Sequence, residues 1–254
     1  GFDVIVTVGS AMAEATQAVA ETYPAIRFVT VDHAYDDAPD NLQGIVFRED
    51  QAGFLAGVLA GQLSASRTVG VVTGPETPPV KRYRDGFANG VASVCRDCQV
   101  IEIAIDSAAD AARGKTAALS QIAEGADIIF GVGGQTGSGA VLGATQDDAW
   151  AIGADVDEYW TTFDGGATEG AGRLLTSAVK RADVAVGAAI ADVVMGRFRG
   201  GEALFDAANG GIGLAPFHDA AAAVPAEVQA RLIETLEALA SGRLSTGVAP
   251  ATGD

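Results

Sequence analysis

The sequence has few basic residues, only two cysteines and no long apolar run. Against 33 Asp and Glu, the 254 residues include 16 Lys and Arg, so the formal net charge is −17. A chain this acidic is not expected to bind a polyanion, which argues against nucleic acid as a partner. No segment reaches the roughly 18 uninterrupted apolar residues of a membrane-spanning helix, so we do not expect the chain to cross a bilayer.

The two cysteines form a single C-R-D-C motif, Cys95 and Cys98, between a predicted helix and a predicted strand. A redox motif would open a helix after a strand, and a zinc site would need a second pair of ligands that His33 and His218 do not obviously supply. We therefore predict a local disulfide or two unreactive thiols, with no metal and no cofactor.

Strand patterns and helix patterns alternate along the chain with short turns between them. Early examples are the strands DVIVTV, IRFVTVD and LQGIVF, and later ones are ADIIFGV, WAIGAD and LLTSAV. Such alternation predicts an α/β fold with parallel sheets flanked by helices. The sequence begins directly on an apolar strand, GFDVIVTVG, so we expect that an N-terminal βα unit is missing.

Two breaks in this pattern predict a division into two lobes. Two-lobed folds of this kind hold small ligands in the cleft at the hinge. The first break is the proline-rich segment GPETPP, and the second lies near Lys180. We predict that residues 1–74 and 179–205 form lobe one and that residues 75–178 and 206–254 form lobe two.

Charged residues follow two of the predicted strands. Asp155 and Asp157 end the strand WAIGAD, and Lys180 ends LLTSAVK. Ligands of open α/β sheets lie outside the carboxyl ends of the strands, so these charges should converge on one site. Asp155 could accept hydrogen bonds from vicinal sugar hydroxyls, whereas Asp157 has the alternative role of capping the next helix.

Glycine-rich and aromatic residues supply further candidates. The turn GVGGQTGSG does not have dinucleotide-loop spacing, so Gly133 and Gly134 are predicted to let a ligand approach backbone amides at a helix N-terminus. ADAARGKT resembles a P-loop but favours a helix start. Tyr83 is the candidate for a flat stacking surface, with a core position as the alternative.

The end of the first strand and the end of the second add three polar candidates. Gly9 and Ser10 would offer a backbone amide and a hydroxyl. Asp32 could reach the same cleft, and a turn-capping role is equally compatible with its position.

Five motifs follow one another along the chain: FREDQAGFLAGVLAG, TGPETPPVKRYRDGF, the glycine turn, GADVDE and SAVKRAD. Their order resembles that of the basic membrane protein family. This resemblance implies a type I periplasmic-binding-protein fold that holds a purine nucleoside between two lobes. It also implies that Asp155 binds ribose, that Tyr83 stacks on the base and that Lys180 is the motif lysine. The family's final Gln in G-V-D-x-D-Q is Glu158 here.

The resemblance implies a monomeric, non-enzymatic substrate-binding protein of an ABC importer that delivers its ligand to a membrane permease. Its place would be extracytoplasmic, in the periplasm or lipid-anchored at the cell surface. One alternative is a LacI-like effector domain, which would need an N-terminal helix-turn-helix. The other is a nucleoside-processing enzyme, for which no nucleophile with a matched base is present.

Overall fold

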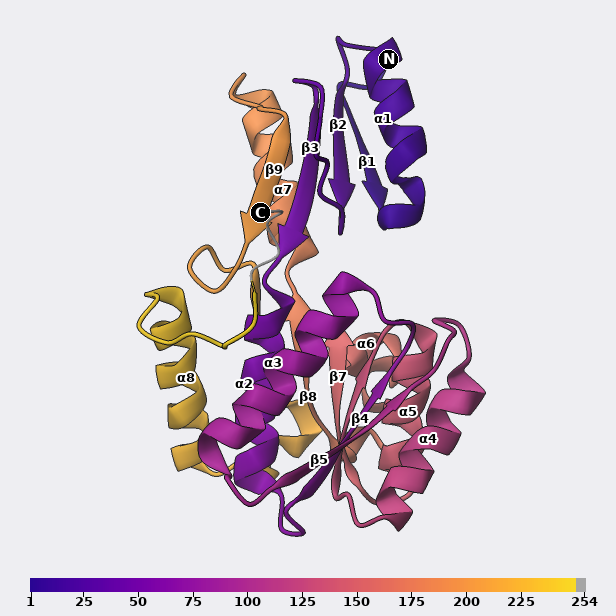
Figure 1. Cartoon of the computed structure of the whole chain (residues 1–254), viewed down its shortest axis with the longest axis vertical. Helices are drawn as coiled ribbons and strands as arrows, with labels where there is room; N and C mark the ends of the chain where they lie inside the picture. Colours follow the sequence, from indigo (N-terminus) through magenta and orange to yellow (C-terminus); the bar gives the residue numbers. More distant parts are fainter. Residues whose placement is uncertain (250–254) are drawn as a thin grey trace. The chain divides into compact units, whose positions relative to one another are not determined.

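The structure is a computed structural model and describes residues 1–249. It divides into two compact units (Figure 1). Unit 1 consists of Gly1–Arg48 and Arg181–Gly211, and unit 2 of Glu49–Lys180 and Ile212–Ala249. The last five residues of the predicted second lobe, 250–254, lie outside the described part of the chain.

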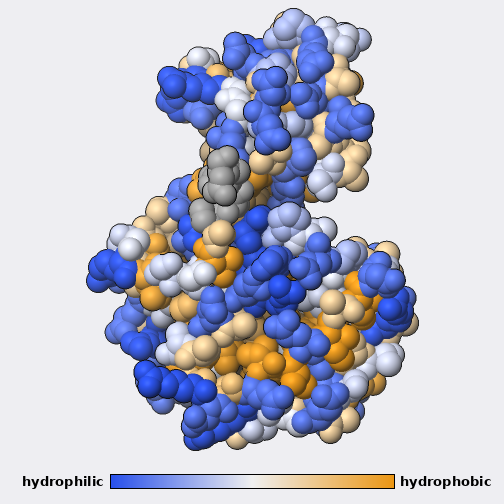
Figure 2. Space-filling model, in the orientation of Figure 1, coloured by the Kyte–Doolittle hydropathy of each residue, from blue (hydrophilic) through white to orange (hydrophobic). Residues whose placement is uncertain are grey.

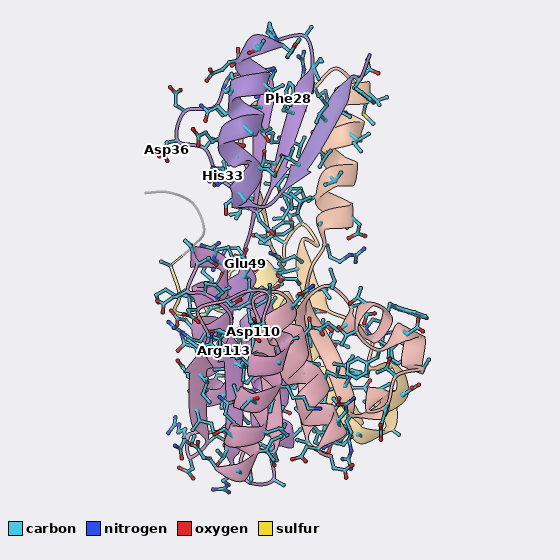
Figure 3. The ribbon with its side chains drawn as sticks, turned by 90° about the vertical axis from the view of Figure 1, so that its right-hand side faces the viewer. Phe28, His33, Asp36, Glu49, Asp110 and Arg113 are labelled. Carbon is cyan, nitrogen blue, oxygen red and sulfur yellow. A yellow bond between two sulfur atoms is a disulfide. The ribbon has the colours of Figure 1, made fainter. Side chains whose placement is uncertain are left out.

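Unit 1 is a four-stranded parallel sheet in the order β1-β2-β3-β9, and α1 and α7 pack against it. Its elements are β1 (Val4–Val8), a 3-10 turn (Ser10–Met12), α1 (Ala13–Thr22), β2 (Arg27–Val31), β3 (Leu42–Phe47), α7 (Ala182–Val194) and β9 (Gly201–Phe205). Phe28, labelled in Figure 3, packs with Ala20 and Leu42 in its core.

Unit 2 is a six-stranded sheet in the order β10-β8-β7-β6-β4-β5, in which only β10 is antiparallel to its neighbour. Its strands are β4 (Thr68–Thr73), β5 (Gln99–Ala104), β6 (Ile128–Val132), β7 (Trp150–Asp155), β8 (Leu174–Lys180) and β10 (Ile212–Leu214). Its helices are α2 (Glu49–Leu63), α3 (Pro78–Val94), α4 (Ala111–Ala123), α5 (Gln135–Gln146), α6 (Glu158–Thr161) and α8 (Ala226–Ala240), with 3-10 turns at Asp164–Gly166, Ala171–Arg173 and His218–Ala223.

Four of the helices of unit 2 form two pairs: α2 packs on α3, and α4 packs on α5. In Figure 1 the two pairs lie on either side of the strands. Between the sheet and the second pair lies a core of alanine and branched aliphatic side chains. Figure 2 shows apolar surface in the region of β5 and α4, where Ile101, Ile103 and Ile122 are only partly buried.

Helices α2 and α3 approach closely because glycine replaces side chains along their contact. A Cβ atom added to Gly57 would lie 2.8 Å from the Val91 nitrogen and 2.9 Å from the Phe87 carbonyl carbon, and Gly53, Gly86 and Gly90 meet the facing backbone in the same way. The first twelve residues of α2 are all buried, including the charged Glu49 and Asp50. The absence of side chains at the four glycines therefore sets where the start of α2 lies relative to α3.

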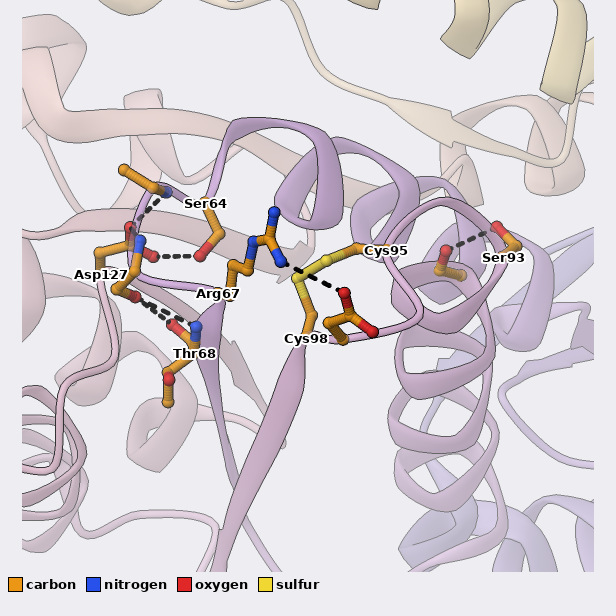
Figure 4. Close-up of a disulfide and its surroundings, with 11 residues drawn as sticks. Ser64, Arg67, Thr68, Ser93, Cys95, Cys98 and Asp127 are labelled. Atoms are coloured by element: carbon orange, nitrogen blue, oxygen red, sulfur yellow. Dashed lines mark hydrogen bonds and ion pairs between the residues drawn. A yellow bond between two sulfur atoms is a disulfide. The ribbon is translucent and has the colours of Figure 1, made fainter.

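Cys95 and Cys98 form a disulfide at the end of α3 (Figure 4). This matches the first of the two predicted alternatives. Beside it, Arg67 pairs with Asp97 at 3.2 Å. The carboxylate of Asp127 accepts hydrogen bonds from the Ser64 hydroxyl and from the next two backbone amides, so it fixes the turn between α2 and β4.

The division between units differs from the predicted lobes. The prediction places the first boundary at residue 74, whereas the structure places it between Arg48 and Glu49. The reason is that β4 lies inside the second sheet, between β5 and β6, and α2 packs on α3. The prolines of GPETPP instead begin α3, since Pro occupies its first helical positions. The pattern also missed β9 and α6.

Replacing Gly57 by Ala should lower the free energy of unfolding of unit 2 by about 1–3 kcal/mol, because α2 and α3 would have to move apart. Gly172→Ala is the matched control, since a Cβ atom there meets nothing within 4 Å. Urea unfolding of both variants provides the comparison. Equal stability of the two would show that the helices are not in contact at Gly57.

Candidate functional site

Four of the five predicted ligand residues of unit 2 lie at the carboxyl ends of three neighbouring strands. Asp155 ends β7, Lys180 ends β8, and Gly133 and Gly134 follow β6. Because β6, β7 and β8 are parallel neighbours, their carboxyl ends share one edge of the sheet. The structure therefore brings these four residues to the same end of unit 2, which we call the β6–β8 edge.

Asp155 and Lys180 form an ion pair at this edge, with 3.0 Å between the Lys180 Nζ and an Asp155 carboxylate oxygen. The Lys180 side chain is only 10% exposed, whereas that of Asp155 is 39% exposed. Asp155 also has a φ of 68°, a backbone conformation that Asp tolerates better than most residues. The buried cation thus holds a carboxylate that still has an open side.

A second, deeper ion pair joins α2 to α3. The Arg82 Nε donates to Glu49 at 2.7 Å, and the two side chains are 14% and 1% exposed. Burial raises the pKa of Glu49, and the positive charges of Lys180 and Arg82 oppose this shift. Figure 3 places Glu49 at the start of α2, near the end of unit 2 that also carries Asp110.

Glu49 and Arg82 form a buried pair linked electrostatically to Lys180, and the sequence reasoning did not select either residue. Two weak signals were present: Glu49 stands at the start of an otherwise largely apolar helical segment, and it belongs to the motif FREDQAGF. A charge at the start of a fully buried helix needs a partner, but no pattern in the sequence identifies Arg82, 33 positions away, as that partner.

The glycine turn after β6 is tight because both of its glycines have positive φ, 92° at Gly133 and 75° at Gly134. A side chain at Gly133 would lie 2.6 Å from the Gly74 nitrogen, and one at Gly134 would lie 2.7 Å from the Ala108 oxygen. Gly134 is exposed and caps α5, whose N-terminus carries the positive end of the helix dipole. The turn can therefore present backbone amides to an electronegative ligand atom.

Asp157 caps the helix that follows it, which is the alternative role predicted for this residue. Its carboxylate accepts a hydrogen bond from the Tyr159 amide at the start of α6 and lies 2.8 Å from the His218 Nε2. The Tyr159 ring stacks on His218 with 4.0 Å between ring centroids. These contacts direct Asp157 toward the 3-10 turn that begins at His218.

Tyr83 differs from its predicted role as a stacking surface. Its side chain is 1% exposed, and its hydroxyl donates to the Ala178 carbonyl oxygen at 3.0 Å. The ring meets Phe130 edge-on, and Phe87 one turn later stacks on the same ring. Tyr83 lies in the core because the face of α3 that carries both aromatics packs against the sheet.

The candidates of unit 1 lie at the carboxyl end of its own sheet. Gly9 follows β1 with a φ of 89°, and its amide donates to the Val31 oxygen at the end of β2. Ser10 is exposed and begins the following 3-10 turn, and Asp32 follows β2 with a φ of 65°. The neighbouring strands thus bring these three residues to one edge of unit 1.

Other motifs have structural roles. Asp110 caps α4 by accepting from the Arg113 amide at 3.0 Å, so ADAARGKT starts a helix as predicted (Figure 3). Among the side chains that the structure describes, no three His, Cys, Asp or Glu gather in a way that could hold a metal ion.

Residues 1–241 match the family described as ABC transporter substrate-binding protein, PnrA-like. The chain belongs to this family. The family is one of non-catalytic binding proteins, which confirms both the resemblance seen in the motifs and the prediction that the chain is not an enzyme.

Known proteins of similar sequence and structure agree with this assignment. The chain is 28% identical over 228 residues to the ABC transporter nucleoside-binding protein BmpA of Lactococcus lactis, which covers 84% of this chain and 64% of BmpA. It is 27% identical to an uncharacterized lipoprotein of Pyrococcus furiosus, over 84% of this chain and 54% of that protein. The chain therefore spans less than two thirds of the length of these curated relatives.

A crystal structure of ABC transporter solute-binding proteins from Aeropyrum pernix superimposes with a TM-score of 0.82 at 26% identity. The superposition covers 98% of this chain and 78% of that one. The predicted fold class, with parallel sheets flanked by helices as in type I periplasmic binding proteins, is confirmed. Within residues 1–249, no helix is both long enough and apolar enough to span a membrane.

Glu158, directly after the capping Asp157, is 3% exposed, and burial raises its pKa from 4.5 to about 7. The folded protein therefore keeps this proton at pH values where the unfolded chain has released it. The resulting stability is fully present below about pH 4.5 and is lost as the pH rises to about 7, roughly 3 kcal/mol in total.

Glu158→Gln should remove this contribution. Urea unfolding from pH 4 to 8 should show that the free energy of unfolding of the parent, relative to that of E158Q, falls by about that amount over this range. A difference that stays constant with pH would show that Glu158 titrates as an ordinary carboxyl.

Proposed function

We propose that this protein binds a purine nucleoside and delivers it intact to the membrane permease of an ABC importer. The observation that carries the proposal is the half-exposed Asp155 carboxylate, held at the β6–β8 edge by the buried Lys180. The nucleoside-binding name of its Lactococcus relative supports the ligand class. The proposal goes beyond the name of this relative in specifying a purine base and the direction of transport.

The chemistry of Asp155 suits a sugar with two adjacent hydroxyls. A carboxylate accepts hydrogen bonds only, so it selects for groups that donate, and vicinal hydroxyls can donate to both of its oxygens. Lys180 orients the carboxylate, because its Nζ lies 3.0 Å from one of the two carboxylate oxygens. Charge-assisted bonds of this kind contribute roughly 1.5–3 kcal/mol each.

The remaining contacts in the proposal are backbone and small polar groups. Gly133 and Gly134 would offer amides at the α5 N-terminus to an electronegative ligand atom. In unit 1 we propose Gly9, Ser10 and Asp32 as further ligand contacts. Tyr83 has no part in the proposal, because its ring lies in the core.

An extracytoplasmic location, in the periplasm or as a lipid-anchored surface protein, fits two observations. The Cys95–Cys98 disulfide is typical of oxidising compartments. One relative is named a lipoprotein. We propose that the protein works there as a monomer. A LacI-like regulator is the less favoured function, since the family match covers nearly all of the chain and a net charge of −17 disfavours binding to DNA.

Asp155→Asn should weaken nucleoside binding by about one to two powers of ten, because the loss of charge weakens the bonds to the ribose hydroxyls. Asn tolerates the positive φ, so the substitution isolates the charge. Asp148→Asn is a matched control, with a φ of 61° and an exposed side chain in the same unit. Calorimetry should find D148N unchanged, and equal loss in both variants would contradict the role of Asp155.

The parent protein should bind a ribonucleoside at least tenfold more tightly than the 2′-deoxynucleoside, and D155N should lose most of this preference. Incubation with inosine, guanosine or adenosine should return each nucleoside intact by chromatography. Release of free base would show that the protein is a nucleoside-processing enzyme instead.

A further inference from the structure

Glu158 follows the turn that contains Asp155, and both oxygens of its carboxyl group form hydrogen bonds. One oxygen lies 2.7 Å from the Thr162 hydroxyl, which donates to the ionised group and can accept from the protonated one, and the other accepts from the Ala154 amide at 3.4 Å. The Glu158 amide donates to the Ser177 hydroxyl on β8 at 3.0 Å. Glu158 therefore ties the end of β7 to α6 and to β8.

The side chain of Glu158 is also held by packing against Gly153 on β7. A Cβ atom at Gly153 would lie 2.9 Å from the Glu158 Cγ and Cδ atoms and 2.8 Å from the Ser177 hydroxyl oxygen. Any side chain at position 153 would displace Glu158. The glycine of the motif GADVDE thus makes room for the glutamate of the same motif.

This arrangement fixes the backbone around Asp155. The Val156 amide donates to the Ala154 oxygen at 2.8 Å, which closes a tight turn with Asp155 at its centre and at a φ of 68°. The Ala154 amide, one residue before Asp155, is bonded to the Glu158 carboxyl. Asp tolerates a positive φ, and the bond from the Ala154 amide to Glu158 holds the residue before it in place.

The charge environment of Glu158 is dominated by burial, which raises its pKa to about 7. Hydrogen bonds from Thr162, Ala154 and Ser138 lower the pKa, and the negative charge of Asp155 raises it. The next carboxylate, Asp157, is paired with His218, and the cation at this edge, Lys180, is paired with Asp155.

We propose that Glu158 is a positioning residue for Asp155 and that the protein binds its ligand with Glu158 in the neutral, protonated form. This inference rests on the proposed function, because it assigns the turn before Glu158 to the ligand. A ligand that covers Asp155 removes water from the turn, and two neighbouring carboxylates are then costly to keep ionised together. Asp155 is paired with a cation and Glu158 is buried, so Glu158 keeps the proton.

Affinity should consequently depend on pH. Below about pH 7 the free protein already holds the proton and binding is independent of pH. Above it, binding must take up a proton, so the affinity falls by up to tenfold per pH unit. Gln has the shape of a protonated Glu and does not titrate. Glu158→Gln should therefore bind with an affinity independent of pH and within about threefold of that of the parent at pH 6.

The experiment is calorimetry of inosine, guanosine and adenosine binding from pH 6 to 9, in pairs of buffers with different ionisation enthalpies. The parent should take up close to one proton at pH 8.5, and E158Q should take up none. Glu158→Ala should bind weakly at every pH, because it removes the bonds that hold the turn. Glu234→Gln, an exposed carboxyl on α8, is the control and should keep the parent's profile.

Two results would overturn the inference alone: parent affinity that is constant from pH 6 to 9, or a pH profile of E158Q that equals that of the parent. Either would leave the proposed function in place, since nucleoside would still bind. If the parent binds no nucleoside at any pH, the proposed function fails and the role of Glu158 fails with it.

Discussion

The close backbone contact of α2 and α3 is the constraint on which the edge of unit 2 depends. Four glycines remove the side chains that would otherwise separate the helices, so the first residue of α2, Glu49, comes within 2.7 Å of Arg82 on α3. A salt bridge buried to this degree is stable only where its geometry is fixed. The glycines supply that geometry, and the charges depend on it.

From this contact the charges continue to the strand ends. Burial raises the pKa of Glu49, Lys180 opposes that rise, and Lys180 also pairs with Asp155. From the interior to the surface, the charges thus alternate in sign: Arg82, Glu49, Lys180 and Asp155. Of the two carboxylates, Asp155 has the more exposed side chain. An interior charge that is compensated in this way keeps its neighbour oriented.

The sequence predicted the strands and helices well because apolar runs and Gly or Pro breaks are local signals. It also predicted that Asp155, Lys180 and the glycine turn would converge, because parallel strands bring their carboxyl ends to one edge. The stacking role predicted for Tyr83 and the boundary predicted at residue 74 both differ from the structure. Whether an aromatic on a helix faces the core, or a proline-rich turn separates units, depends on packing partners far away in the chain. Glu158 was visible as a departure from the motif, but its burial was not.

The pairing of β3 with β9 joins segments more than 150 residues apart, at Phe47 and Phe205 for example. Strands β4 to β8 of the second sheet, by contrast, all fall within Glu49–Lys180. During synthesis the greater part of unit 2 can therefore form while β1, β2 and β3 still lack their fourth strand. Contacts between residues far apart in sequence are slow to form, so the sheet of unit 1 waits for β9 before its fourth strand can pair.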